Sequence, residues 1–278
     1  MQFIFSTGSL YTYGIDRCFA LAAEAGFDGI ELMVDQRWDT RQPDYLLGLV
    51  AQFKQPVRAV HSPFWAVPGW PADEVGRINE AVKLAEVLGA GVVIHHLPLR
   101  GDWVWAEIGG VRFPLPLPLE GRQRAYRRWL LGDYFVRQAQ TKVQLCIENM
   151  PARRALGRAW NAHQWNRVAE IARFAALTLD TTHLGTWGLE PSVVYARLKG
   201  RVRHVHLSNF DGREHRLPEH GHLALDRLLA HMAGDGYDGV ITLELHPDAV
   251  GAGEPDEQIV ARLRESLAHC RAWREAVD

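Results

Sequence analysis

Side chains that can bind metals follow one apolar run after another along this chain. Runs such as Leu145–Ile147 and Leu177–Leu179 are each followed at once by a carboxylate. One histidine or acid after an apolar run is more often a structural residue, but a series of them carries information. Six successive runs end in this way, and the residues concerned are His61, the pair His95 and His96, Glu148, Asp180, His206 and Glu244.

The chemistry of these residues indicates a divalent metal. Several carboxylates brought into one place repel one another unless a cation lies between them. A ligand set that mixes histidine with carboxylate suits zinc, manganese or cobalt better than calcium. We therefore expect a site for manganese, zinc or cobalt, with magnesium less favoured.

The apolar runs have the length and spacing of strands separated by helices. Helical periodicity is seen over 15–23, 75–85, 225–232 and 259–270. Alternation of strand and helix implies a parallel sheet covered by helices. Eight strands are expected, over Gln2–Phe5, Gly29–Met33, Val57–Val60, Gly91–His95, Val143–Ile147, Leu177–Leu179, Val202–Leu207 and Gly239–Leu245.

Closure of these strands into a barrel would gather the polar strand ends. The active site of a parallel barrel lies at the C-terminal ends of its strands. A doubly wound sheet is the alternative, but it would not bring six strand ends into one ring. The sequence thus predicts an α/β fold, a single (β/α)₈ TIM barrel that occupies residues 1–278 as one domain.

Alternation along the strands predicts what lies beneath the ring. If Glu148 points into the barrel, Cys146 does so one layer lower. Asp180 and Glu244 would likewise stand over Thr178 and Thr242. Cys146 is therefore expected in the core, and not as a nucleophile.

One long segment lacks an obvious strand or helix pattern. It runs from Leu97 to Glu120 and contains alternating leucine and proline over Leu115–Leu119. Irregular segments of this length in a compact domain are often lids or binding loops. We expect a loop insertion at about 97–120 that covers the barrel mouth.

Bulk composition is that of an ordinary globular enzyme. The chain has 278 residues, of which 47% are hydrophobic and 23% charged, and its formal net charge is −2. Three scattered cysteines do not suggest disulfides. Neither a signal peptide nor a membrane span is evident. These features favour a cytoplasmic protein with no membrane partner, which could form oligomers.

The motifs together resemble the xylose-isomerase-like barrel superfamily, which contains sugar isomerases and epimerases and the endonuclease IV type of abasic-site endonuclease. The resemblance covers nearly the whole chain. Each motif is short, and their order and spacing make the match specific. They are Val60–Phe64, Ile94–His96, Ile147–Met150, Leu179–His183, His204–His206, His215 with Gly221, and Tyr237–Gly239 leading to Glu244.

The epimerase branch of this family implies a single metal held by Glu148, Asp180, His206 and Glu244. It also implies that Glu148 and Glu244 flank the substrate and exchange its proton, which makes them the predicted catalytic residues. The sugar 3-epimerases carry a further glutamate shortly afterwards, where this chain has arginines. Arg153, Arg154 and Arg158 could face a phosphate or carboxylate of the substrate, or form a solvated basic loop.

The endonuclease branch implies a three-zinc cluster with additional histidine ligands. Their matches here are His61, His96, His183 and His215. An aspartate two residues before the last histidine completes that cluster, and this chain has Arg213 there. The four histidines could thus hold a second metal, or they could contact substrate hydroxyls or orient the metal ligands.

Side chains after the strands supply possible substrate contacts. Sugar faces stack on aromatic rings, which makes Trp38, Phe64 and Trp187 candidates, although such rings also serve in loop packing. Arg213 is the fourth candidate.

Three functions from different classes follow from these features. The first is a metal-dependent isomerase or epimerase that moves a proton next to a carbonyl of a small sugar-like substrate. The second is a phosphodiesterase that cuts nucleic acid at abasic sites with a zinc cluster. The third is a non-catalytic barrel that binds metal or sugar. The pair Glu148 and Glu244 disfavours the third, and Arg213 with the near-neutral charge favours the first.

Overall fold

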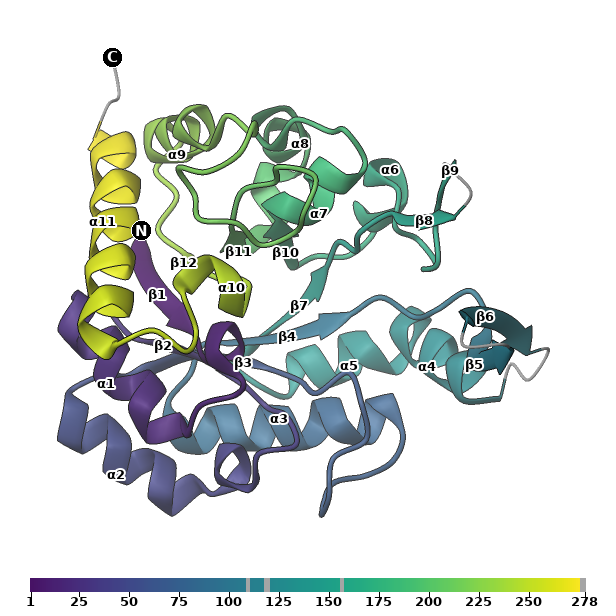
Figure 1. Cartoon of the computed structure of the whole chain (residues 1–278). Coiled ribbons are helices and arrows are strands. Elements are labelled where there is room, and N and C mark those ends of the chain that lie inside the picture. Colours follow the sequence, from purple (N-terminus) through teal and green to yellow (C-terminus); the bar gives the residue numbers. More distant parts are fainter. Residues whose placement is uncertain (109–110, 118–120, 156–157, 276–278) are drawn as a thin grey trace.

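The strands close into one parallel barrel, as predicted. The computed structural model describes residues 1–108, 111–117, 121–155 and 158–275. The barrel order is β1-β12-β11-β10-β7-β4-β3-β2, so the first and last strands of the chain pair with each other (Figure 1). The strands are β1 (Gln2–Ser6), β2 (Ile30–Met33), β3 (Val57–His61), β4 (Val92–His96), β7 (Gln144–Glu148), β10 (Leu177–Asp180), β11 (Val202–Leu207) and β12 (Val240–Leu243).

Helices cover the outside of the barrel. α3 illustrates how the sequence sets their ends: the Asp73 side chain accepts a hydrogen bond from Gly76 N, and Gly89 ends the helix with φ at +71°. The helices are α1 (Ile15–Ala25), α2 (Pro43–Phe53), α3 (Glu74–Leu88), α4 (Gly121–Leu131), α5 (Asp133–Ala139), α6 (Val168–Ile171), α7 (Thr181–Thr186), α8 (Pro191–Leu198), α9 (Leu225–Gly234), α10 (Pro247–Val250) and α11 (Asp256–Glu275), with short 3₁₀ turns η1 (Thr7–Leu10), η2 (Trp38–Arg41) and η3 (Lys199–Arg201).

Two apolar regions stabilise this arrangement. The larger lies between the barrel and the helices and includes Phe19, Leu84 and Leu263. The smaller fills the barrel interior with Ile4, Ala59, Val92, Ile94, Cys146 and Ala176. Cys146 is fully buried there, which confirms that it belongs to the core.

The register of the strands staggers the ring of polar residues. Glu148 is level with His96 on β4 but with Thr178 on β10, so Asp180 lies one layer above Glu148. Asp180 is level with His206, and His206 is level with Thr242, so Glu244 is again one layer higher. His61 is level with Ile94, two residues below His96, so the ring is a spiral that rises from His61 through Glu148 to Glu244.

The prediction of an irregular loop over Leu97–Glu120 is wrong for 102–108 and 111–117, while residues 109–110 and 118–120 lie outside the described residues. β5 (Asp102–Ile108) and β6 (Val111–Leu117) form an antiparallel hairpin in this segment. Proline disfavours a strand locally, yet Pro114 and Pro116 lie within β6, level with Trp105 and Trp103 of β5.

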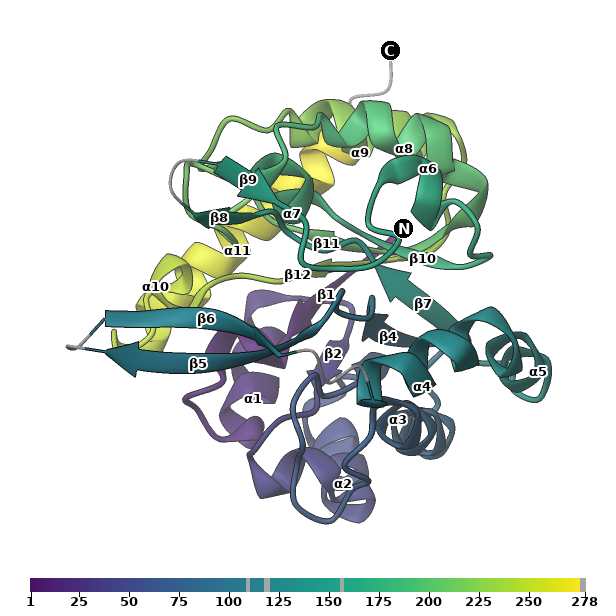
Figure 2. The same ribbon diagram turned by 90° about the vertical axis from the view of Figure 1, so that its right-hand side faces the viewer.

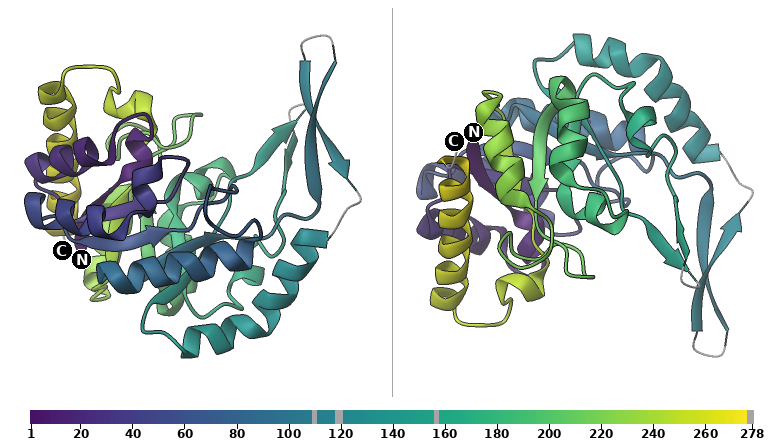
Figure 3. Two further views of the ribbon diagram at one scale, coloured as in Figure 1. Left: turned by 90° about the horizontal axis from the view of Figure 1, so that it is seen from below. Right: turned by 90° about the horizontal axis from the view of Figure 1, so that it is seen from above.

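The hairpin of β5 and β6 stands away from the barrel. Figure 2 views the molecule from the side of the C-terminal strand ends, and there the hairpin extends from the middle of the picture to the left. Figure 3 shows it projecting beyond the helices. A second, shorter hairpin joins β8 (Arg153–Ala155) to β9 (Arg158–Trp160), where the sequence suggested a loop. No helix among the described residues is long and apolar enough to span a membrane.

Candidate metal centre

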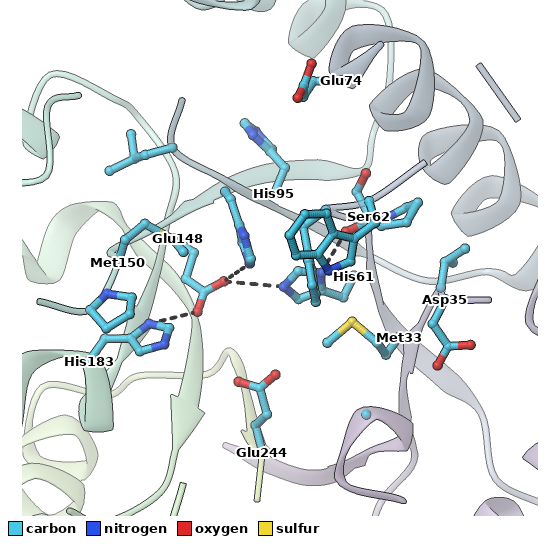
Figure 4. A pocket seen from close by; sticks show the side chains of 18 of the residues that line it. Met33, Asp35, His61, Ser62, Glu74, His95, Glu148, Met150, His183 and Glu244 are labelled. Atoms are coloured by element: carbon cyan, nitrogen blue, oxygen red, sulfur yellow. Dashed lines mark hydrogen bonds and ion pairs between the residues drawn. The ribbon is translucent and has the colours of Figure 1, made fainter. Parts of the chain in front are cut away.

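A cavity of about 750 Å³ opens at the C-terminal ends of the strands. Glu148, His183 and Glu244 face one another across part of it (Figure 4). The cavity lies where a parallel barrel normally carries its active site.

Glu148 is the central side chain of this site. It is buried, and its Oε2 lies 3.3 Å from Nε2 of both His61 and His96. Its Oε1 lies 3.2 Å from Nδ1 of His206 and 3.3 Å from Nδ1 of His183. Burial alone would raise the pKa of the Glu148 carboxyl, but His206 and the other histidines hold it well below its ordinary range.

The four predicted metal ligands meet in one group. Glu148, Asp180, His206 and Glu244 each offer an atom within 4.8 Å of the others. Nδ1 of His206 lies 3.1 Å from Oε2 of Glu244 and 3.7 Å from Oδ2 of Asp180. The C-terminal ends of β7, β10 and β11 and the residue after β12 thus bring three carboxylates and one imidazole to a common point.

This group fits a divalent cation. Oδ2 of Asp180 is buried and has no hydrogen-bond partner among the described residues, although buried carboxylate oxygens are normally paired. Burial raises the pKa of Asp180 to about 8, and neighbouring Glu148 and Glu244 contribute to the increase. Burial likewise raises the pKa of Glu244. A cation would supply the missing partner and relieve the repulsion.

Local hydrogen bonds hold Asp180 in position. The Asn149 side chain accepts from Asp180 N at 2.8 Å and donates to Asp180 O at 3.0 Å, which ties the ends of β7 and β10 together. Oδ1 of Asp180 accepts from His183 N at 2.7 Å and so caps α7. One oxygen of Asp180 is thereby fixed while the other faces the site.

Glu31 is a buried site residue that sequence reasoning missed. It lies on β2 in the layer below the ligands, and its Oε2 is 3.0 Å from Nε2 of His206 and 3.2 Å from Nε2 of His204. Thr242 donates to the same oxygen at 2.9 Å, and Ser6 donates to the other at 3.2 Å. Because Nε2 of His206 is bonded to Glu31, its Nδ1 is directed at the carboxylates above.

Three further groups of ligand atoms adjoin the first. They are Glu31 with His204 and His206, His61 with His96 and Glu148, and Asp180 with His183 and His215. Burial alone would lower the pKa of His183, but Asp180 and Glu148 raise it to about 10. The four predicted metal ligands and the four additional histidines, His61, His96, His183 and His215, thus all lie at the barrel mouth.

Arg213 does not lie in this cluster. Its exposed side chain forms an ion pair of 2.8 Å with Asp211, on the loop after β11. Glu214, the next residue, does approach the cluster: its Oε2 lies 3.8 Å from Nε2 of His183, and it lines the cavity. His95 points outward from the barrel, where its Nδ1 lies 2.8 Å from the Tyr126 hydroxyl, whereas His96 contacts Glu148 in the site.

The four predicted substrate contacts divide into one that lines the cavity and three that do not. Phe64 lines it, and its ring stacks on His96 at 5.1 Å with an interplanar angle of 10°. Trp38 is 68% exposed on η2, apart from the residues that line the cavity. Trp187 donates to Met150 O and borders a second cavity of about 450 Å³. Arg213, as described, points to solvent.

The chain thus folds as a closed parallel barrel that carries a candidate metal centre at the C-terminal ends of its strands. The chain belongs to the xylose isomerase-like TIM barrel family, whose model matches residues 19–273. An uncharacterized protein of Mycobacterium leprae is 27% identical to it over 96% of both chains. An uncharacterized protein of Mycobacterium tuberculosis is 26% identical over 96% of this chain and 95% of that protein.

Solved structures with the same fold include several epimerases. A D-tagatose 3-epimerase-like protein matches with a TM-score of 0.66 and 19% identity over 99% of this chain and 98% of that one. A 3-keto-D-glucoside 4-epimerase from E. coli matches with a TM-score of 0.69 and 18% identity over 98% and 99%. A D-psicose 3-epimerase matches with a TM-score of 0.68 and 12% identity over 99% of both chains. At these identities the likeness establishes the fold.

Proposed function

We propose that this protein is a divalent-metal-dependent isomerase or epimerase of a sugar, sugar phosphate or related polyol. The single observation that carries the proposal is the placement of Glu148 and Glu244 about Nδ1 of His206, at 3.2 and 3.1 Å, within one ligand group. The epimerases among the structures with the same fold give it independent support.

The side chains present could carry out proton transfer between two carboxylates. Asp180 and His206 would hold a manganese, zinc or cobalt ion together with the two glutamates. When bound, the metal supplies polarisation of the substrate carbonyl. One glutamate would accept the proton from the carbon next to that carbonyl, and the other would return a proton to the opposite face. Glu148 is buried, whereas the side chain of Glu244 is 15% exposed where it lines the cavity.

Solvent deuterium uptake tests the proposal. The metal-loaded protein would be incubated in D₂O with a panel of ketoses and inosose-type polyols, and products would be examined by NMR and mass spectrometry. We expect deuterium at the carbon next to the carbonyl of at least one compound, and loss of the exchange after chelation. Absence of uptake across the panel by protein that retains metal would count against this function.

A phosphodiesterase acting at abasic sites is the second candidate, and the adjacent ligand groups favour it. His61, His96 and Glu148 could hold a second ion, while His183, His215 and Glu214 lie together beside Asp180. About one tight metal per chain would favour the isomerase, and two or three would favour hydrolysis. Cleavage of a duplex with one abasic site is the direct assay.

A further inference from the structure

Three large rings line the part of the cavity that lies beyond the histidines. They are Tyr11, which follows η1, and Phe64 and Trp65, which follow β3. All three are exposed, and the exposed fraction of Trp65 is 68%. Met33 and Val67 continue the apolar surface between them. Figure 4 shows Met33 on the other side of His61 from Glu148 and His183.

One ring contact joins this aromatic surface to the candidate ligands. Phe64 stacks on His96, whose Nε2 contacts Glu148, so Phe64 lies next to the candidate metal ligands. The ring centroid of Trp65 lies 5.7 Å from that of Phe64, and Tyr11 lines the same cavity from a different loop. A single sugar ring held at Glu148 and Glu244 could stack on Phe64 but would leave the rest of this surface uncovered. A cavity of about 750 Å³ is of the size that encloses drug-sized ligands.

The charges of the cavity do not favour a phosphate. Apart from histidines, the positively charged side chains among its described lining residues are Arg37 and Arg153. Arg37 is committed to Asp35, with Nη2 2.6 Å from Oδ2, and to the carbonyl oxygen of Tyr13 at 3.0 Å. Arg153 is an exposed residue of β8. The acidic lining residues are Asp35, Glu74, Glu148, Glu214 and Glu244. Recognition of a phosphate normally uses several arginines or lysines, and with Arg37 paired, Arg153 is the remaining arginine of the described lining against five carboxylates.

We propose that the substrate has two parts, a polyol or sugar that reacts at the metal centre and a bulky, uncharged apolar group that lies against Tyr11, Phe64 and Trp65. The inference rests on the proposed function for the polyol part and narrows its substrate class to apolar glycosides, ethers or esters. Exposed aromatic surface inside a cavity is stabilised when an apolar group covers it, and rings contribute most of that gain.

Binding by matched ligands tests the inference. Each ketose of the panel would be offered to the metal-loaded full-length protein unmodified, as the O-benzyl ether of its terminal carbon, and as the phosphate at that carbon. Isothermal titration would give Kd, and deuterium uptake would be measured on the same samples. We expect at least one benzyl ether to bind about 10-fold or more tightly than its parent ketose, and the phosphate to bind no better than the parent.

The variant Trp65→Ala isolates the apolar surface, because the Trp65 ring packs on Phe64, whereas Phe64 itself stacks on His96. It should reduce the preference for the benzyl ether about fivefold or more. Trp38→Ala is the matched control, since Trp38 is 68% exposed like Trp65 but is not among the residues that line the cavity, and it should keep the full preference.

The outcomes separate this inference from the proposed function. Equal Kd values for ether and parent, tightest binding by the phosphate, or a preference that survives Trp65→Ala would each overturn the apolar group. Preferential binding of the ether without deuterium uptake in any compound would support the apolar group and count against the isomerase.

Discussion

The two sides of the ring of strand ends differ in how their buried polar side chains are paired. On the side of β7, β10, β11 and β12, three carboxylates surround His206, and Oδ2 of Asp180 has no hydrogen-bond partner among the described residues. On the side of β3 and β4, His61 has both ring nitrogens engaged, with Ser62 O at 2.9 Å and Glu148 at 3.3 Å. His96 contacts Glu148 and is covered by Phe64.

This difference indicates which side a metal would stabilise more. The carboxylate side gathers three acids and an oxygen without a hydrogen-bond partner among the described residues, so a cation would stabilise it when its acids are ionised. On the histidine side, His61 and His96 already contact Glu148. Glu148 belongs to both sides, and the four predictions below distinguish them.

The largest effect is expected from substitution of Glu148, which contacts both sides of the ring, and of Glu244, which lies on the carboxylate side. Glu148→Gln and Glu244→Gln should each lower kcat by about 10³-fold or more, because each removes both a proton acceptor and a metal ligand. Deuterium uptake and metal analysis would measure this. Glu214→Gln, which removes an acid of the cavity outside the four-residue group, should retain the bound metal. If both glutamine variants keep metal and full turnover, the assignment of the site is wrong.

A smaller effect is expected from the layer beneath the ligands. Glu31→Gln should weaken metal binding about 10-fold, because Glu31 accepts from Nε2 of His206 and orients its other nitrogen. Equilibrium dialysis against zinc or cobalt would give the affinity. Ser6→Ala, which removes a weaker contact to the other oxygen of Glu31, should change it little. Equal affinities in Glu31→Gln and the parent would show that the carboxylate side does not rely on this support.

The histidine side is tested by the double variant His61→Ala with His96→Ala. If a second, weaker metal binds there, the variant should lose about one metal equivalent and keep the ion held by Asp180, His206 and Glu244. Proton release on zinc addition should fall with it, since ligands must be deprotonated to bind. A variant that binds as much metal as the parent would exclude the second position, and with it the abasic-site hydrolysis.

The smallest effect concerns stability and pH in the absence of metal. The raised pKa of Asp180 means that the folded chain holds a proton that the unfolded chain releases above about pH 4. Stability contributed by this proton is lost as the pH rises towards about 8, and the raised pKa of His183 acts in the same direction above about pH 6.5.

Asp180→Asn should therefore flatten the fall of Tm between pH 5 and 8 by a few degrees in chelator-treated protein. Differential scanning calorimetry of both proteins would measure the difference. Metal-loaded parent protein should show the shallower slope as well, because the ion replaces the proton. Parallel slopes in variant and parent without metal would contradict the burial of an uncompensated acid at this position.

The sequence determined the barrel and most of the ring because both depend on local pattern. A short apolar run followed by His61, Glu148 or Asp180 needs only neighbouring residues to define a strand and its end. Since parallel strands of a barrel share one direction, their ends must gather on one rim. Alternation then placed Cys146 beneath Glu148 without knowledge of any long-range contact.

Glu31 shows what such patterns leave open. A carboxylate in the middle of the buried strand Ile30–Met33 must have a partner, and this was the available signal. Its partners, His204 and His206, are more than 170 residues away, and only closure of β1 with β12 brings them together. The spiral register that lets Glu148 serve both sides is likewise a property of strand pairing.

Side chains on the connecting segments were decided by the tertiary structure. Trp38, Trp187 and Arg213 follow strands as Phe64 does, yet Phe64 alone of these four lines the cavity. Arg213 is drawn to Asp211 and Trp187 to the carbonyl oxygen of Met150, and neither contact has a periodic signature. The hairpin of β5 and β6 was not predicted because proline disfavours a strand locally, whereas the pairing of the two segments depends on the tertiary structure. The position of a strand end follows from the geometry of the barrel, whereas the position of a loop side chain depends on the residues that it contacts.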